Sequence, residues 1–254
     1  MIGENTYETF LMEMVKIYAR ARKAGGCRHV DPRVVRGRAH CVAGYFEDAF
    51  ADLISKKIFW KKEKRLRVFT DFPVTVEPAL RKQEKKHKER ATYYIDVMVC
   101  CDCGEGEFEI LYMAELKTNT GWMRGKVKSR LEENQKFANH ISLPGTSISV
   151  RSESLKDSVL SEAFAKCNFK VSAGLCYDLI VLSGTNIDPD RLSDAAKFNN
   201  EKGSLFVLTD DTVGGEHDKN FSPKPRKKDF KEMSSRIKRC LNRKGALNGW
   251  SFQR

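Results

Sequence analysis

Two apolar runs separated by a short glycine-containing segment constrain this fold most strongly. The first run is Tyr93 to Val99 and the second is Ile110 to Leu116, and both are rich in β-branched and aromatic residues. Between them lies Gly104-Glu105-Gly106, a turn-forming sequence. Together they predict an antiparallel hairpin with a loop of roughly four or five residues.

The register of this hairpin brings three charged residues together. A loop centred near residue 105 places Asp96 opposite Glu115. Because side chains alternate along a strand, Glu115 and Lys117 share a face, and that face also holds Asp96. Two opposed carboxylates destabilise a strand pair, and a bound cation reverses the sign of that effect. The other pairs in this register are Met98 with Met113 and Cys100 with Leu111. A metal site is one interpretation, and three exposed charges on an ordinary strand pair are the other.

Length and charge limit the classes of protein. The 254 residues fit a single domain over residues 1–254, with a core over about 43–209, an N-terminal helix over 5–24 and a basic extension over 215–254. The net charge of +12 favours a polyanionic partner, although an anionic membrane surface attracts the same charge. No apolar run reaches the roughly 18 residues of a membrane span, and no secretion signal is evident, so we expect a cytoplasmic protein without membrane contact.

Cysteine spacing gives no clear metal motif. The eight cysteines form no pair of CxxC motifs, which argues against a zinc ribbon. Cys100, Cys101 and Cys103 remain candidates for soft ligands at the hairpin tip. Reduced, buried thiols are the interpretation we favour for a cytosolic chain.

The remaining pattern predicts helices and strands on both sides of the hairpin. Predicted helices cover about residues 39–56, 126–141, 155–167, 189–199 and 228–242, and predicted strands cover 66–70, 73–77, 177–182 and 205–208. The strand, helix, strand order after residue 177 predicts a parallel pair. On the second helix, Glu47 lies among apolar neighbours and is the acid expected to point inward, although such carboxylates also reach solvent at helix edges.

This order of elements resembles the PD-(D/E)xK nuclease superfamily, which includes restriction endonucleases and repair and recombination nucleases. The resemblance covers roughly residues 43–209 and implies a restriction-endonuclease-like α/β core, in which helices flank a mixed sheet of an antiparallel hairpin and parallel strands. Asp96 matches the first acid of the motif, Glu115 and Lys117 match its Glu-x-Lys, and Glu47 matches an extra helix acid. Gln135 is followed four residues later by Asn139, where exonuclease-like members have a tyrosine.

The resemblance implies a site for Mg²⁺, with Mn²⁺ as a substitute. Asp96, Glu115, the Leu116 carbonyl and Glu47 are the expected ligands, and Lys117 is expected to act on the attacking water. Basic residues beyond the motif are the expected backbone contacts of a nucleic acid. They are Trp122, Arg124, Lys126, Lys128 and Arg130. A solvated helix face is the alternative for each of them. The charged run over residues 81–90 is either a solvated loop or a phosphate-contacting arm.

These expectations describe a Mg²⁺-dependent endonuclease acting on double-stranded DNA, of the type II restriction class. A repair or recombination nuclease of the same superfamily is an open alternative, and an RNA endonuclease is a less favoured one. A non-catalytic nucleic-acid-binding module explains the charge but leaves Asp96, Glu115 and Lys117 without a role. Cutting both strands commonly takes two active sites, so a homodimer is also a possible assembly.

Overall fold

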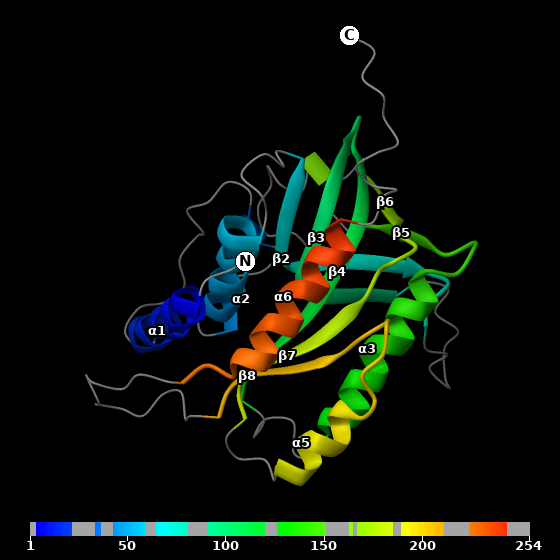
Figure 1. Cartoon of the computed structure of the whole chain (residues 1–254). Coiled ribbons are helices and arrows are strands. Elements are labelled where there is room, and N and C mark those ends of the chain that lie inside the picture. Colours follow the sequence, from blue (N-terminus) through cyan, green and yellow to red (C-terminus); the bar gives the residue numbers. More distant parts are fainter. Residues whose placement is uncertain are drawn as a thin grey trace.

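One mixed sheet with helices on both faces forms the framework of the protein (Figure 1). The computed structural model describes residues 4–21, 34–36, 43–58, 65–80, 91–119, 126–150, 163–164, 167–184, 189–210 and 224–242. Within these residues the sheet has eight strands, both parallel and antiparallel. The expected α/β class and the mixed sheet flanked by helices are therefore confirmed. Among the described helices, none is long and apolar enough to cross a membrane.

The elements follow one another in the order that the sequence predicts, with additions. The helices are α1 Glu4–Ala21, α2 Ala43–Leu53, a π-helix η1 Ile54–Ile58, α3 Val127–Ile141, α5 Pro189–Ala196 and α6 Lys227–Leu241. The strands are β1 Val34–Arg36, β2 Leu66–Glu77, β3 Ala91–Gly104, β4 Glu107–Asn119, β5 Ser147–Ser149, β6 Asn168–Val171, β7 Tyr177–Ser183 and β8 Leu205–Thr209. The short strands β1, β5 and β6 had no clear signal in the sequence. Most of the helix expected over 155–167 lies outside the described residues, as does the 81–90 run.

The predicted hairpin is formed by β3 and β4, with a tighter turn than expected. Val97 pairs with Ala114 and Met98 with Met113, as the register predicts. A register shift after Val99 then pairs Cys100 with Ile110, so the expected partner Leu111 was wrong. The loop is two residues long, because Gly104 pairs with Glu107 and both Glu105 and Gly106 have positive φ angles of 53° and 78°. Positive φ at both positions is the mark of a type I′ turn, whose twist suits a hairpin.

Strands β4, β7 and β8 run parallel and form one half of the sheet. Glu115 pairs with Leu179 of β7, and Leu179 pairs in turn with Leu205 of β8. The predicted parallel pair is thus confirmed. Helix α3 follows β4 in the chain and packs against β7, with Val127 and Leu131 against Leu179 and Val181. Strands β5 and β6 lie between α3 and β7 in the sequence.

Strand β2 is a single long strand, which corrects the expectation of two short strands joined at Asp71-Phe72. It pairs with β3 over most of its length and with β5 near Glu77. Pairing of β5 with β6 and of β6 with β4 then closes a ring of strands. Aromatic side chains fill the ring, including Phe69, Phe72, Phe108 and Phe169.

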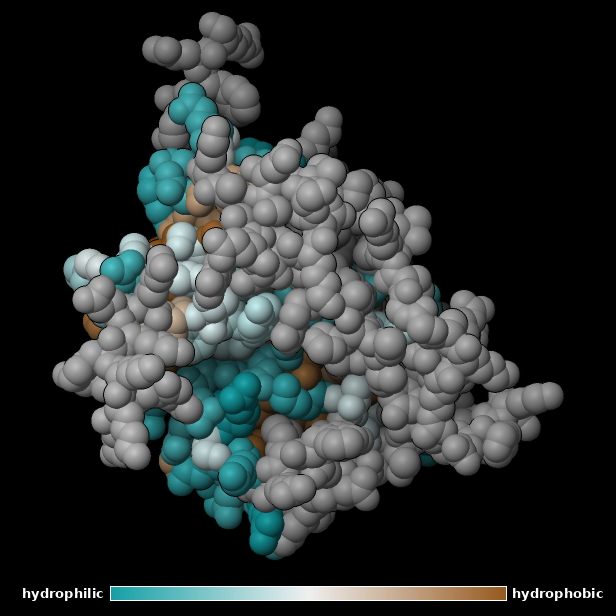
Figure 2. Space-filling model, turned by 180° about the vertical axis from the view of Figure 1, so that it is seen from behind, coloured by the Kyte–Doolittle hydropathy of each residue, from teal (hydrophilic) through white to brown (hydrophobic). Residues whose placement is uncertain are grey.

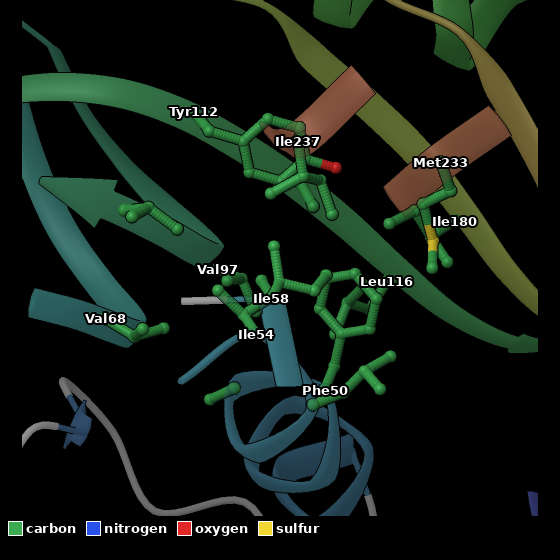
Figure 3. Close-up of a cluster of buried hydrophobic side chains, with 14 of the residues drawn as sticks. Phe50, Ile54, Ile58, Val68, Val97, Tyr112, Leu116, Ile180, Met233 and Ile237 are labelled. Carbon is green, nitrogen blue, oxygen red and sulfur yellow. The ribbon is translucent and has the colours of Figure 1, made fainter. Parts of the chain in front are cut away.

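The two faces of the sheet are covered by different helices. Side chains of α1, α2, η1 and α6 share one apolar cluster with Val97, Ala114 and Leu116 of the hairpin. Figure 3 shows Phe50 from α2 and Met233 and Ile237 from α6 in this cluster with sheet residues. Helices α3 and α5 pack against Leu179 and Val181 on the other face. Alternation along β4 therefore directs Glu115 and Lys117 toward the face that α3 covers.

Candidate functional site

Asp96 is the first acid of the site and lies in the middle of the sheet. Its Oδ2 accepts a hydrogen bond of 2.8 Å from the Leu116 backbone N–H, and the Lys117 Nζ is 3.8 Å from the same oxygen. Burial raises the pKa of Asp96 to about 6, although Lys117 and the Leu116 N–H lower it. The neighbouring charges of Glu115 and Asp71 raise it further. Asp96 is thus a carboxyl in a crowded acidic setting, as the predicted register requires.

Glu115 is the most enclosed of the predicted residues, with 2% of its side chain exposed. Lys117 Nζ lies 2.8 Å from its Oε1. Arg130 Nε donates to both carboxylate oxygens, at 2.7 Å to Oε1 and 2.6 Å to Oε2. Burial opposes the charge of Arg130, but the Glu115 carboxylate outweighs that effect and raises the pKa of the guanidinium above its ordinary value. Two cations therefore neutralise the Glu115 carboxylate.

A third carboxylate, Asp71, belongs to the same row of the sheet. It lies between the pairs Thr70 with Val97 and Phe72 with Ile95, which places it opposite Asp96. Asp71 is 2% exposed and has a φ of 44°, and its charge raises the pKa of Asp96. The sequence suggested a turn at this position, because Asp commonly occurs in turns. Three adjacent strands thus each contribute an acid to one row.

Tyr177 of β7 was also missed by the sequence reasoning. It pairs with Met113, two residues before Glu115, and its ring contacts Phe137 of α3 at 5.8 Å between centroids. Burial raises the pKa of its hydroxyl, and the charges of Glu115 and Asp96 add to that effect. A tyrosine inside an apolar strand gives no sequence signal for a site.

The structure describes three of the five predicted nucleic-acid contacts, Lys126, Lys128 and Arg130. Trp122 and Arg124 lie outside the described residues. Lys126 and Lys128 are exposed at the start of α3, and Lys128 Nζ lies 3.7 Å from the centroid of the Phe198 ring. The Arg130 side chain is 46% exposed and reaches back to Glu115. In Figure 2, hydrophilic residues gather on the side where Figure 1 places α3 and α5.

Glu47 is buried, with 4% of its surface exposed, as expected for an inward-pointing acid. It lies on α2, however, and Phe46 and Phe50 of that helix pack into the cluster on the opposite face of the sheet. The contacts described above join Asp96, Glu115, Lys117 and Arg130 without it.

The carboxylates of the site are hard oxygen donors. Asp96 and Glu115 supply carboxylate oxygens from neighbouring strands, and Mg²⁺ commonly takes one or two carboxylates while keeping several waters. In the part of the chain that is described, however, no group of three or more His, Cys, Asp or Glu side chains is spaced to hold a metal ion. Cys100 and Cys101 are buried free thiols, and burial raises the pKa of both. Asp96 and Glu115 are the two carboxylates of the site that could supply oxygen ligands, and Arg130 Nε bonds both oxygens of Glu115 in the structure.

Gln135 links α3 to the segment that precedes β8. Its Nε2 donates to the backbone carbonyls of Phe198 and Gly203, at 2.8 and 2.9 Å. These bonds tie α3 to the segment between α5 and β8. Comparison with known proteins adds no relative: no protein-family model, no curated protein and no solved structure matches the chain.

Proposed function

We propose that this protein is a Mg²⁺-dependent endonuclease that hydrolyses phosphodiester bonds of double-stranded DNA. The observation that supports it is the convergence of Asp96, Glu115 and Lys117 on one face of two paired strands. A type II restriction enzyme is the particular class we propose, with a repair or recombination nuclease as the alternative. Such an enzyme would act in the cytoplasm and could cut both strands as a homodimer.

The residues of the site have distinct tasks in this proposal. Asp96 and Glu115 bind the cation, with the Leu116 carbonyl as a further ligand. When bound, Mg²⁺ neutralises charge on the scissile phosphate and lowers the pKa of a bound water. The Lys117 ammonium, 2.8 Å from Glu115, orients the attacking water and stabilises charge on the phosphate. The products carry a 5′ phosphate and a 3′ hydroxyl.

Substrate affinity comes from basic residues beside the site. Lys126 is the N-cap residue of α3 and Lys128 lies in its first turn; both are exposed, and Arg130 of the same turn contacts Glu115 of β4. Lysines at this position contact phosphate oxygens and supply affinity without reading sequence. Trp122 and Arg124, which precede them in the chain, are proposed to contact a groove or a base.

Plasmid cleavage tests the proposal directly. Supercoiled plasmid is incubated with Mg²⁺, with Mn²⁺ and with EDTA, using the unmodified protein, Glu115→Gln and Lys117→Ala. Each substitution should lower the rate about 10²–10⁴-fold, because each removes a group that acts on the metal or the water. Discrete fragments favour restriction-type cleavage, and a smear favours a nuclease without sequence preference.

Two matched variants control for general effects of charge. Glu109→Gln changes the same residue type near the other end of β4, and Lys136→Ala removes an exposed lysine two turns into α3. Both should cleave at the unmodified rate. Cleavage that survives Glu115→Gln and Lys117→Ala would rule out the proposed site.

A non-catalytic nucleic-acid-binding module is the second candidate, and one observation favours it. Both oxygens of Glu115 already accept bonds from cationic side chains, as in a purely structural ion-pair network. Tight binding of duplex DNA without cleavage in any divalent cation would support this alternative.

A further inference from the structure

We infer that Arg130 holds the metal-free site closed by occupying Glu115, and that a phosphate group of the nucleic acid draws Arg130 away. The inference rests on the proposed function and concerns how that site is regulated. Arg130 is a positioning residue in this scheme, because it controls when Glu115 becomes available to a cation. The consequence is that metal and nucleic acid bind to the site together and only weakly one at a time.

The contacts of Glu115 leave little room for a cation. Oε1 receives the Lys117 ammonium at 2.8 Å and Arg130 Nε at 2.7 Å, and Oε2 receives Arg130 Nε at 2.6 Å. Bonds this short to a charged donor are the strong ones in proteins. The Glu115 carboxylate thus faces two cationic groups at its own oxygens, and a divalent ion that approaches Glu115 meets both of them, although Asp71 and Asp96 lie in the same row of the sheet.

Arg130 is better placed to leave than Lys117. Its side chain is 46% exposed, whereas Lys117 is 30% exposed and Glu115 only 2%. The guanidinium also bonds Glu133 through Nη1 at 3.0 Å, so part of the group already lies at the surface. Rotation about the side chain of an arginine in the first turn of a helix can carry the guanidinium outward without moving the backbone.

Phosphate is the ligand that competes for Arg130. Guanidinium groups match phosphate oxygens in a paired geometry and bind them as strongly as carboxylates. Arg130 lies one helical turn after the exposed Lys126, on the same side of α3. A backbone phosphate bound at Lys126 therefore arrives within reach of Arg130. When Arg130 leaves, the Glu115 carboxylate loses one of its two cationic partners, and this happens when the substrate is present.

The experiment measures Mn²⁺ affinity without DNA, by the paramagnetic resonance signal of free Mn²⁺. The unmodified protein should bind Mn²⁺ weakly, and Arg130→Gln should bind it at least about tenfold tighter, because the competing charge is gone. Arg130→Lys keeps a cation within reach of Glu115 and should stay close to the unmodified protein. Lys136→Gln removes a distant charge from the same helix and should leave the affinity unchanged.

A second measurement adds a short DNA duplex. It uses the Lys117→Ala background, in which the duplex remains intact. The duplex should tighten Mn²⁺ binding at least about tenfold when Arg130 is present and much less in Arg130→Gln, because coupling between two ligands is reciprocal. Thermal unfolding in EDTA checks that Arg130→Gln is folded. If it shows no cooperative transition, Arg130→Met replaces it. The comparison of Mn²⁺ binding with and without duplex in the protein that keeps Arg130 then also tests the inference.

The outcomes separate this inference from the proposed function. If the unmodified protein binds Mn²⁺ and cleaves DNA but Arg130→Gln binds no tighter, Arg130 is a structural bridge and the inference is overturned. If no variant binds Mn²⁺ and none cleaves, the proposed function fails, and the inference fails with it.

Discussion

Asp96 is a residue of the proposed site whose burial destabilises the fold at neutral pH. The side chain is 23% exposed, yet burial is the main reason that its pKa rises to about 6. At neutral pH the carboxylate is ionised in both the folded and the unfolded chain, and the folded chain bears the cost of burying the charge. Groups placed against their own preference in this way are common in functional sites.

Asp96→Asn should stabilise the metal-free protein at neutral pH. An acid whose folded pKa is raised stabilises the fold below its unfolded pKa, near 3.8, and that contribution is lost as pH rises through about 6. The asparagine carbonyl can still accept from Leu116. We expect a gain on the order of 1–2 kcal/mol at pH 7–8, reduced by partial solvent access, and almost none at pH 4.

The measurement is chemical unfolding of both proteins in EDTA from pH 4 to pH 8. A stability difference that is independent of pH would contradict the role assigned to Asp96. The same substitution should abolish Mg²⁺-dependent cleavage, so stability and activity change in opposite directions.

Some residues of the site could be predicted from the sequence, and the reason is local. Asp96, Glu115 and Lys117 share a face because side chains alternate along paired strands, and the numbering alone carries that information. The contact of Arg130 with Glu115 depends on how α3 packs against the sheet, which no local pattern specifies. Asp71 was hidden for another reason: its residue type indicates a turn, while β2 continues through it.

At the scale of elements, the hairpin illustrates what turn chemistry adds to periodicity. The apolar alternation predicted the pairing near Val97 and Met98 correctly. It could not predict the shift after Val99, because a bulge changes the register without changing the apolar pattern. Nor did it indicate a two-residue turn, since Glu105 is a poor residue for a positive φ.

Glu105→Asn should therefore stabilise the hairpin. Glu105 has a φ of 53°, in the left-handed region that asparagine tolerates better than glutamate, and it precedes a glycine as in favoured type I′ turns. We expect a gain of up to about 1 kcal/mol, and Gly106→Ala at φ 78° should cost a similar amount.

Thermal unfolding of the two variants checks this expectation. Cleavage should be unchanged in Glu105→Asn, because the turn is at the opposite end of the hairpin from Asp96 and Lys117. A lower melting temperature in Glu105→Asn would contradict the assigned turn type.

At the scale of the whole molecule, the C-terminal helix completes the core. The sequence predicted a basic extension over residues 215–254. Its helix α6 also buries Met233 and Ile237 against the sheet (Figure 3) and Phe230 against Tyr7 and Phe10 of α1. The sequence predicted a helix over about 228–242 but not its packing partner, because the contact joins residues far apart in the chain. One ion pair marks the contact, between Arg236 of α6 and Asp178 of β7.

This ion pair is fully enclosed on the carboxylate side. Arg236 Nε donates to both oxygens of Asp178, at 2.9 and 3.1 Å, and the Ser204 backbone N–H donates at 2.8 Å. Burial raises the pKa of Asp178 to about 6, even though Arg236 and the Ser204 N–H lower it. Because this pKa lies only slightly below neutral pH, the Asp178 carboxylate is ionised at pH 7. The charge of Arg236 is the largest of the influences that lower this pKa.

Arg236→Ala should cost about 3–5 kcal/mol at pH 8, because it leaves a buried carboxylate without its cation. Removal of Arg236 raises the folded pKa of Asp178 further above 6. The variant therefore loses stability as pH rises from the unfolded pKa of Asp178 to this higher folded pKa. It is least affected near pH 5, where Asp178 is protonated in the folded protein. The double variant Arg236→Ala, Asp178→Asn should recover part of the loss at pH 8. Lys238→Ala on the same helix is the matched control and should change stability by less than about 0.5 kcal/mol. Chemical unfolding at pH 5 and pH 8 measures all four proteins, and an equal loss at both pH values, with no recovery in the double variant, would show that Arg236 acts through packing alone.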